Sequence, residues 1–297
     1  MNKKLEYVFI VNPIAGSQNA DEVIERIHEV CRKHELKYRI IKTERPKHAS
    51  EIVRKLPKTG KVIFAVGGDG TMNEVLQGMM KTNNVMGVIP NGTGNDFSAS
   101  LAKIKDKEPK IDVGVLNHRQ YFLNYVGMGF STNVTVAASQ KFRRKWIPKK
   151  ARFPLSILHT VATFRPMKIK FTINGTTKEE RSTIIVAANG SRFGLEYFIA
   201  PEADLRDGEM DICFVDAVSL PVLIPLINSV KTGEHVKNPN VHMRRTDHVK
   251  IQSEKHVSFD IDGELMTANK LDIKIIRGGV TIFNDQKFIR EIVDDES

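Results

Sequence analysis

The chain has 297 residues, of which 41% are hydrophobic and 27% charged, and its formal net charge is +10. This composition is typical of a globular protein with about two domains and excludes a disordered chain. The two cysteines, Cys31 and Cys213, are too few for a disulfide framework or a thiolate zinc site, so we expect two buried thiols in a reducing compartment.

The first residues are not expected to act as a signal peptide. Their apolar run is interrupted by Glu6 and ends at Asn12 and Pro13, which makes it shorter than the apolar core of a secretory signal. No window of the sequence approaches the ~18 apolar residues that a membrane-spanning helix needs. We therefore expect a cytoplasmic protein.

Strand and helix patterns alternate through the first third of the chain. Short apolar runs predict strands, and apolar residues on one helical face predict helices. This alternation indicates an α/β domain with a mostly parallel sheet covered on both faces. The predicted strands are 7–12, 37–43, 61–66 and 85–90, and the predicted helices are 20–36, 49–56 and 72–80.

Three glycine-bearing loops leave the carboxyl ends of these predicted strands. Their sequences are NPIAGSQN (12–19), GGDGT (67–71) and NGTGND (91–96). Ligands of parallel sheets bind at the carboxyl ends of the strands. The position of the loops is therefore the first indication of a binding site.

The second of these loops is suited to phosphate. Gly67, Gly68 and Gly70 lack a Cβ, so backbone N–H groups can approach phosphate oxygens, and Thr71 adds a hydroxyl donor. A carboxylate beside phosphates is repulsive unless a cation stands between them, so Asp69 indicates magnesium, held through water. The alternative is a tight turn in which the aspartate is a cap. The loop at 91–96 repeats the same chemistry.

Other phosphate-binding signatures are missing. The sequence has no G-x-x-x-x-G-K-[ST], which excludes a P-loop enzyme, and no G-x-G-x-x-G after the first strand, which excludes the dinucleotide fingerprint. Protein-kinase signatures are missing as well.

From about Ile111 the pattern changes to many short strands. Such a succession predicts a β-sandwich-like second domain, and a helical interlude over 131–165 interrupts it. We predict an α/β nucleotide-binding domain at 1–112 and a β-rich domain at 113–284. The C-terminal segment 285–297 is expected to rejoin the first domain.

The whole excess of positive charge lies in the helical interlude and its surroundings. No Asp or Glu occurs between Val113 and Lys178, and basic residues alternate with Phe142, Trp146 and Phe153. This pattern is typical of a surface that meets anionic headgroups and inserts shallowly into a membrane. Nucleic acid binding or a solvated helix would give the same pattern.

Five motifs in order carry a family resemblance. NPIAG (12–16), GGDGTMNEV (67–75), PNGTGNDF (90–97), APEADLRDGEMDI (200–212) and DIDGE (260–264) resemble motifs of the bacterial diacylglycerol kinase family of soluble lipid kinases, which is related to sphingosine and ceramide kinases. GGDGT alone is shared with NAD kinases. The ordered set extends the resemblance over nearly the whole chain.

The resemblance implies ATP as co-substrate and Mg²⁺ as cofactor. The residues implied to hold the nucleotide are Asn12, Pro13, Ile14, Ala15, Gly16, Thr43, Gly68, Asp69, Gly70, Thr71, Met72, Asn73, Glu74 and Thr93. Those implied to organise the catalytic magnesium and its waters are Asp69, Asp96 and Asp112. A separate structural magnesium site is implied at Asp204, Asp207 and Glu209, where the alternative is an ordinary turn without metal.

The resemblance also implies that Asp262 and Glu264 face the lipid hydroxyl, one of them as general base. Phosphoryl transfer needs a proton acceptor, and no histidine lies in a phosphate loop. Asp260, Asp262 and Glu264 stand at alternate positions, so in a strand they would share a face and raise one another's pKa. The choice between Asp262 and Glu264 stays open, and a solvated acidic strand end is the alternative.

Two positions depart from the family pattern. SAS (98–100) follows NDF where members often carry an arginine, and Ser131 stands where many have an aspartate. The first departure removes a phosphate contact or a partner for a carboxylate. Fold is therefore better determined by the resemblance than catalytic strength or substrate choice.

Together these features predict a lipid kinase that phosphorylates the free hydroxyl of diacylglycerol, or of a related lipid, to give phosphatidic acid. We expect it on the cytoplasmic face of an anionic membrane, with no nucleic acid partner, and whether it forms a homodimer stays open. The residues expected to contact the membrane are Arg143, Arg144, Trp146, Lys149 and Lys150. The alternatives are an NAD kinase and a nucleotide-dependent lipid-binding regulator without turnover.

Overall fold

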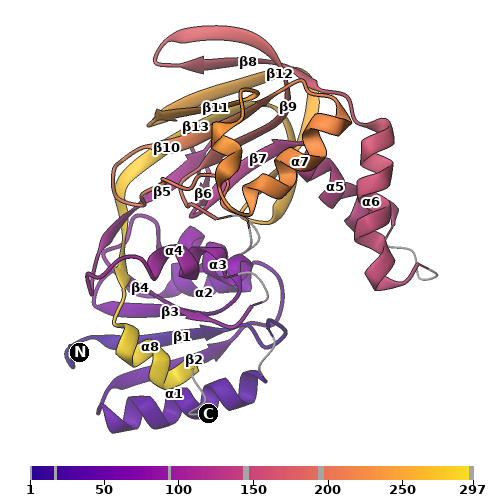
Figure 1. Cartoon of the computed structure of the whole chain (residues 1–297). Coiled ribbons are helices and arrows are strands. Elements are labelled where there is room, and N and C mark those ends of the chain that lie inside the picture. Colours follow the sequence, from indigo (N-terminus) through magenta and orange to yellow (C-terminus); the bar gives the residue numbers. More distant parts are fainter. Residues whose placement is uncertain (1, 17–18, 93–94, 143–146, 193–196, 294–297) are drawn as a thin grey trace. The chain divides into compact units, whose positions relative to one another are not determined.

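The computed structural model describes residues 2–16, 19–92, 95–142, 147–192 and 197–293 (Figure 1). The chain forms two units. The first takes in Met1–Val113, Leu205–Asp207 and Ile276–Ser297, and the second takes in Gly114–Asp204 and Gly208–Ile275. The C-terminal return to the first unit thus begins at Ile276, where the sequence suggested 285.

The first unit alternates strands and helices around a parallel set of strands. β1 pairs in parallel with β2 and β3, β3 pairs with β4, and β4 pairs with the last residues of β13. The carboxyl ends of β1, β3 and β4 therefore lie at the same edge. The elements are β1 (Glu6–Val11), α1 (Ala20–Lys33), β2 (Lys37–Lys42), α2 (His48–Lys55), β3 (Lys61–Gly67), α3 (Asp69–Met79), β4 (Val85–Pro90), α4 (Asp96–Leu101) and α8 (Gln286–Val293).

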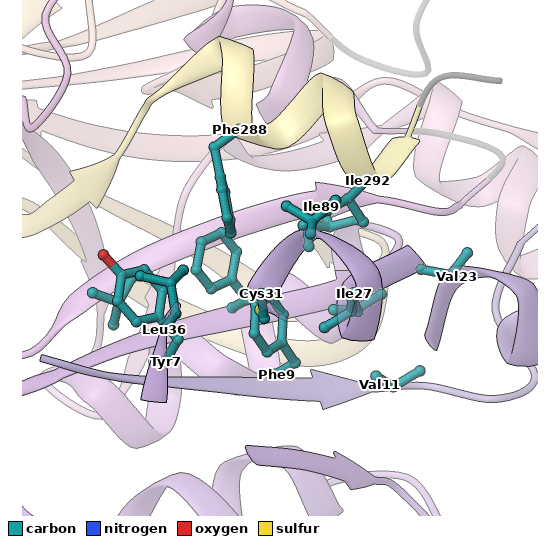
Figure 2. Close-up of a cluster of buried hydrophobic side chains, with 14 of the residues drawn as sticks. Tyr7, Phe9, Val11, Val23, Ile27, Cys31, Leu36, Ile89, Phe288 and Ile292 are labelled. Atoms are coloured by element: carbon teal, nitrogen blue, oxygen red, sulfur yellow. The ribbon is translucent and has the colours of Figure 1, made fainter. Parts of the chain in front are cut away.

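A buried cluster of apolar and aromatic side chains holds these elements together (Figure 2). Val23 and Ile27 of α1 pack with Phe9 of β1, whose ring stacks on that of Phe64 with centroids 4.8 Å apart. From the C-terminal helix α8, Phe288 and Ile292 enter the same cluster and are almost fully buried. The first unit's core is thus completed by the end of the chain.

The second unit is mainly strands, paired antiparallel. Its elements, some of which begin or end in the first unit, are β5 (Lys110–Leu116), β6 (Gln120–Phe122), β7 (Tyr125–Gly129), α5 (Phe130–Val136), α6 (Lys149–Thr163), β8 (Met167–Ile173), β9 (Thr176–Ala188), β10 (Met210–Asp216), α7 (Leu220–Val230), β11 (Val241–Thr246), β12 (His248–Ile261) and β13 (Glu264–Phe283). Across the described pairings antiparallel strands predominate, so the chain's sheet as a whole is not mostly parallel.

The sheet of the second unit folds over into two layers. The long strands β9 and β12 each pair with β8 at one end and with β7 at the other. β8 and β7 thus connect the same two strands twice, and strands that bend between layers in this way enclose a core. The enclosed apolar cluster includes Phe122, Met128 and Phe259. This arrangement agrees with the predicted β-sandwich-like domain.

Helices α5, α6 and α7 lie in the second unit, and the sequence indicated only the first two. Between them, α5 and α6 account for much of the predicted helical interlude, with a π-helical turn at Ala137–Lys141. α7 was missed because its sequence is almost wholly apolar and contains Pro221 and Pro225, which do not suggest a helix interior. Pro221 lies in the first turn of α7, where proline is well tolerated.

Candidate active site

Three glycine-bearing loops meet at the carboxyl edge of the first unit's strands. A Cβ on Gly16, which follows β1, would lie 1.9 Å from the carbonyl oxygen of Asn91, which follows β4. A Cβ on Gly92 would lie 2.4 Å from the Cα of Gly68, which follows β3. The backbones therefore touch at both places, and only glycine fits.

Hydrogen bonds join the same loops. The Asn12 side-chain amide donates to the Thr71 hydroxyl at 3.1 Å, and its carbonyl oxygen accepts from the Ile14 N–H at 3.2 Å. At the end of β2, the Thr43 N–H donates to the Val11 carbonyl at 2.8 Å. The structure thus brings Asn12, Thr43 and Thr71 to one edge.

The start of α3 offers room for an anion. Gly68 is the N-cap of this helix, so the first-turn N–H groups follow directly from the loop. A Cβ on Gly70 would meet no atom within 4 Å. The fold does not require glycine at position 70, so the open space there fits the predicted close approach of a phosphate.

Asp69 has a structural role that the sequence offered only as an alternative. Its carboxylate accepts from the backbone N–H groups of Asp96 at 3.2 Å and Phe97 at 3.4 Å, which caps α4. Burial raises the pKa of Asp69, and the neighbouring Asp96 carboxylate adds to this effect, while the backbone donors oppose it. Two carboxylates thus lie close together beside a phosphate-type loop.

Other residues of the predicted nucleotide site face elsewhere. The Glu74 carboxylate accepts from the N–H groups of Lys47 at 2.7 Å and Ala49 at 3.1 Å, which caps α2. Met72 is fully buried in the unit's core. Thr93 lies outside the described residues.

Asp112 is buried in β5, and its carboxylate accepts from the Gly278 N–H at 2.7 Å. The pair Asp69 and Asp96 fits a hard cation, because a cation would relieve the repulsion that raises the pKa of Asp69. Within the described ranges, no three His, Cys, Asp or Glu side chains are grouped as ligands of a metal ion.

In the second unit, the prediction that Asp260, Asp262 and Glu264 share one face of a strand is wrong. Ile261 pairs with Glu264, which makes Asp262 and Gly263 the two-residue turn of a hairpin, both with positive φ (46° and 89°). Asp-Gly favours such turns because both positions need φ > 0. Asp260 therefore lies on β12 and Glu264 on β13, and the pairing puts them on opposite faces.

The three carboxylates have different surroundings. Asp262 is buried and accepts from the backbone N–H groups of Leu123 at 2.7 Å, Asn124 at 3.0 Å and Tyr125 at 3.0 Å. Asp260 accepts from the Gly263 N–H and the Tyr125 hydroxyl, and burial raises its pKa. Glu264 is exposed and accepts from the Gln120 amide at 3.2 Å.

Two asparagines beside Asp262 were missed. The Asn189 amide donates to the Leu123 carbonyl at 2.7 Å, and the Asn189 N–H donates to the Asn124 carbonyl at 2.7 Å. The side-chain oxygen of Asn124 is buried without a hydrogen-bond partner in the described structure. Their sequence signal is a polar residue next to an apolar strand, in NYVG and AANG, which is too weak to recognise alone.

The predicted structural magnesium site falls in an acidic segment. Glu209 lies 3.7 Å from the Arg245 guanidinium, and the same arginine lies 3.9 Å from Asp211. Burial raises the pKa of Asp211 to about 6, and the charges of Glu202 and Glu209 add to the effect. Asp204 belongs to the second unit and Asp207 to the first.

The predicted membrane contact is described only in part. Arg143, Arg144 and Trp146 lie outside the described residues, and Lys149 and Lys150 begin α6. Leu158 of α6 is 66% exposed and Ile224 of α7 is 55% exposed. In the parts of the chain that the structure covers, no helix is long and apolar enough to cross a bilayer.

Two family models match the chain. The diacylglycerol kinase catalytic domain matches residues 6–121, and the YegS C-terminal NAD kinase beta sandwich-like domain matches residues 124–284. Among similar curated proteins, "Putative lipid kinase YtlR" of Bacillus subtilis is 30% identical over 88% of this chain and 93% of its own. "Diacylglycerol kinase" of Staphylococcus haemolyticus is 29% identical over 78% of this chain and 74% of its own.

The fold is shared with solved structures. A diacylglycerol kinase from Bacillus anthracis superposes with a TM-score of 0.71 at 19% identity, over 97% of this chain and all of that chain. At this level of identity the similarity establishes the two-domain fold and nothing finer.

Proposed function

Since this chain belongs to the diacylglycerol kinase-like family of lipid kinases, we propose that it transfers the γ-phosphoryl group of ATP to the free hydroxyl of diacylglycerol, giving phosphatidic acid. The observation that carries the proposal is the meeting of three glycine loops at one edge of the first unit. That edge combines backbone donors, a helix start and two close carboxylates.

The loop 67–71 would bind the phosphates of ATP. Its backbone N–H groups and the start of α3 present partial positive charge to an anion. The open space at Gly70 permits close approach, and the Asn12–Thr71 hydrogen bond fixes the hydroxyl that would donate to a phosphate oxygen. The role of these residues is to position the phosphates and to neutralise charge.

Asp69, Asp96 and Asp112 would hold Mg²⁺ and its waters. When bound, the ion supplies charge neutralisation of the transferred phosphoryl group. Asp69 would at the same time keep its hydrogen bonds to the start of α4 and so couple the ion's position to the loop after β4. A second, structural Mg²⁺ at Asp204, Asp207 and Glu209 is also part of the proposal.

Glu264 is the better candidate for general base. The Asp262 carboxylate is buried and accepts from three backbone donors, whereas a general base must be within reach of the substrate hydroxyl. The Glu264 carboxylate is exposed, so a substrate hydroxyl can reach it. Asp262 would act as a positioning residue that fixes the hairpin.

The second unit would contact the cytoplasmic face of an anionic membrane. The proposal rests on the basic segment around α6 and on the exposed apolar residues Leu158 and Ile224. α5, α6 and α7 share one apolar cluster, so these exposed residues belong to one packed layer of helices. Basic residues would give attraction to anionic lipids, and apolar side chains would insert shallowly.

Phosphate transfer from radiolabelled ATP to a panel of acceptors tests the proposal. With Mg²⁺ and mixed micelles, we expect labelled phosphatidic acid from diacylglycerol. Label in NADP from NAD would establish the NAD kinase alternative. Binding of nucleotide and lipid with no labelled product from any acceptor would establish the regulator without turnover.

A further inference from the structure

We propose that the second unit carries a binding site for a single-chain anionic amphiphile, in a cavity between the two layers of its sheet. The cavity has a volume of about 230 Å³ and is lined by side chains of β8, β9, β10, β11 and β12. None of its lining residues is among those assigned to ATP, magnesium or proton transfer. The site is thus additional to the proposed kinase activity and does not depend on it.

The interior of the cavity is apolar. Ile251 pairs with Phe171 in one layer and Ile185 pairs with Phe214 in the other, so each pair presents its side chains on one face of its layer. The Phe171 and Phe214 rings approach across the layers, with centroids 5.7 Å apart. Ile251 and Ile185 are 4% and 2% exposed, so they form a closed apolar floor.

Charged side chains lie at the rim of the cavity. They occupy the cavity-lining faces of the two layers, on which most of the other residues are apolar. Lys178 pairs with Phe171, and Arg244 pairs with Ile212. Residues directly opposite in an antiparallel pair point to the same face, so these two basic side chains share the cavity-lining faces. Polar residues at core-facing positions are expected where they serve a function.

Two further polar side chains share the rim. Glu180 pairs with Ile169, and His242 pairs with Phe214. The His242 imidazole lies 3.0 Å from Asp216, which would balance a charge on it. The rim therefore carries two positive charges, on Lys178 and Arg244, and one negative charge, on Glu180. This excess of positive charge favours an anionic headgroup over a cationic one.

The size of the cavity sets the number of chains. A dry apolar cavity of ~150 Å³ binds benzene, whereas sites for drug-sized ligands have ~300–1,000 Å³. The volume of this cavity lies between these two values, so the cavity can hold part of one alkyl chain and is too small for the two chains of a diacylglycerol. The headgroup would be a carboxylate or a phosphate monoester, which both accept charge-assisted hydrogen bonds from Arg and Lys.

The test is calorimetric titration of the full chain with dodecanoate and with dodecyl phosphate, each below its critical micelle concentration. We expect one site, with affinity rising about fourfold per methylene from eight carbons until the cavity is full, which corresponds to ~0.8 kcal/mol per CH₂. Binding of dodecanoate alone would identify a fatty acid site, and binding of dodecyl phosphate alone a site for monoacyl phosphates. Dodecyltrimethylammonium should not bind. Binding of neither anion would overturn the proposal.

Paired charge variants locate the binding. Lys178→Gln with Arg244→Gln should weaken binding about tenfold or more. Its control, Arg181→Gln with Lys250→Gln, removes one lysine and one arginine from the opposite face of the same layer, where their cross-strand partners are Lys168 and Thr172, and should have no effect. Equal losses in both double variants would show nonspecific attraction and refute the site.

A variant at the mouth tests entry of the chain. Ile173→Trp places a larger side chain at a half-buried position that lines the cavity and so narrows it. It should abolish the rise of affinity with chain length while the thermal unfolding midpoint stays near that of the wild type. An unchanged chain-length dependence would place the alkyl chain outside the cavity and contradict the proposal.

Discussion

Individual carboxylates of this chain differ in the hydrogen bonds that they accept from backbone N–H groups. Asp69 and Asp262 each accept hydrogen bonds from several backbone N–H groups, whereas Glu264 is exposed and accepts from the Gln120 side-chain amide. A carboxylate bound by several backbone donors fixes local structure, and an exposed carboxylate within reach of a substrate hydroxyl can accept its proton. Substitution at each position should therefore separate structural from chemical roles.

Asp69→Asn should lower turnover at least ~10-fold, because the amide cannot replace a carboxylate around Mg²⁺. Stability should fall by only ~1 kcal/mol, since the amide oxygen still accepts from the first residues of α4. Steady-state kinetics and thermal unfolding measure the two effects. Asp106→Asn, which alters an exposed carboxylate of the same unit, is the control. Near-normal turnover in Asp69→Asn would remove this residue from the magnesium network.

Glu264→Gln and Asp262→Asn should have opposite signatures. Glu264→Gln should lower kcat ~10²-fold or more with unchanged stability, as expected for loss of a general base. Asp262→Asn should lower the free energy of unfolding by about 2 kcal/mol or more, because charge-assisted hydrogen bonds to three backbone donors are weakened. Denaturant unfolding measures the stability of both variants, and phosphate-transfer kinetics measure their kcat. A fully active Glu264→Gln would move the base elsewhere.

The raised pKa of Asp260 predicts a pH dependence of stability. Because burial favours the protonated form, the native state holds this proton more tightly than the unfolded state, so the stability contribution falls as pH rises from about 3.9 through the native pKa. Asp260→Asn keeps the acceptor for Gly263 and cannot ionise. Its stability relative to the wild type should therefore increase from pH 4 to pH 7. Denaturant titrations at each pH measure it, and a constant difference would disprove the shift.

Among the secondary-structure elements, continuous apolar strands that end in clear turns could be predicted from the sequence. Elements whose sequence gives conflicting signals could not. β1, β3 and β4 are continuous apolar strands, so their ends and the glycine loops could be located from sequence. The hairpin at Asp262 was read as an alternating strand, although Asp-Gly is a strong turn signal. α8 is only two turns long, and its place in the core depends on Phe288 and Ile292 meeting strands from the other end of the chain. The return of 285–297 to the first domain was expected, but no local pattern contains the helix α8 or its contacts.

The basic helical segment should control membrane binding. Replacing Arg143, Arg144, Lys149 and Lys150 with glutamine should weaken binding to phosphatidylglycerol vesicles ~10²-fold or more, since each basic residue near the surface contributes ~1 kcal/mol. Binding of the wild type should weaken as salt rises. Vesicle cosedimentation measures both effects. Activity on a short-chain soluble diacylglycerol should change much less.

A matched control neutralises Lys55, Lys58, Lys81 and Lys105, which are exposed in the first unit. It removes the same charge and should leave vesicle binding near the wild-type value. Equal weakening in both quadruple variants would mean that net charge, and not this segment, governs the attraction. Leu158→Ser should weaken binding without changing the salt dependence, because it removes only apolar insertion.

At the scale of the whole molecule, each unit contains one buried thiol. Cys31 lies in the first unit's core and Cys213 in β10 of the second, and burial raises the pKa of each to about 12. Neither should react with a disulfide reagent at pH 8 in the native protein, whereas both should react after unfolding. Cys31→Ser and Cys213→Ser variants then report each unit separately along a denaturant gradient. Rapid labelling of either native thiol would contradict its burial.

The discontinuous first unit has a consequence for biosynthesis. Its core needs Phe288 and Ile292, and its parallel strands need the end of β13, all of which leave the ribosome after the second unit. Apart from the short excursion at Leu205–Asp207, the second unit is complete once Ile275 has emerged. Translation therefore delivers all of the second unit before the first unit can close its core. The amino-terminal unit, although synthesised first, therefore cannot complete its core until the segment 276–293 has emerged.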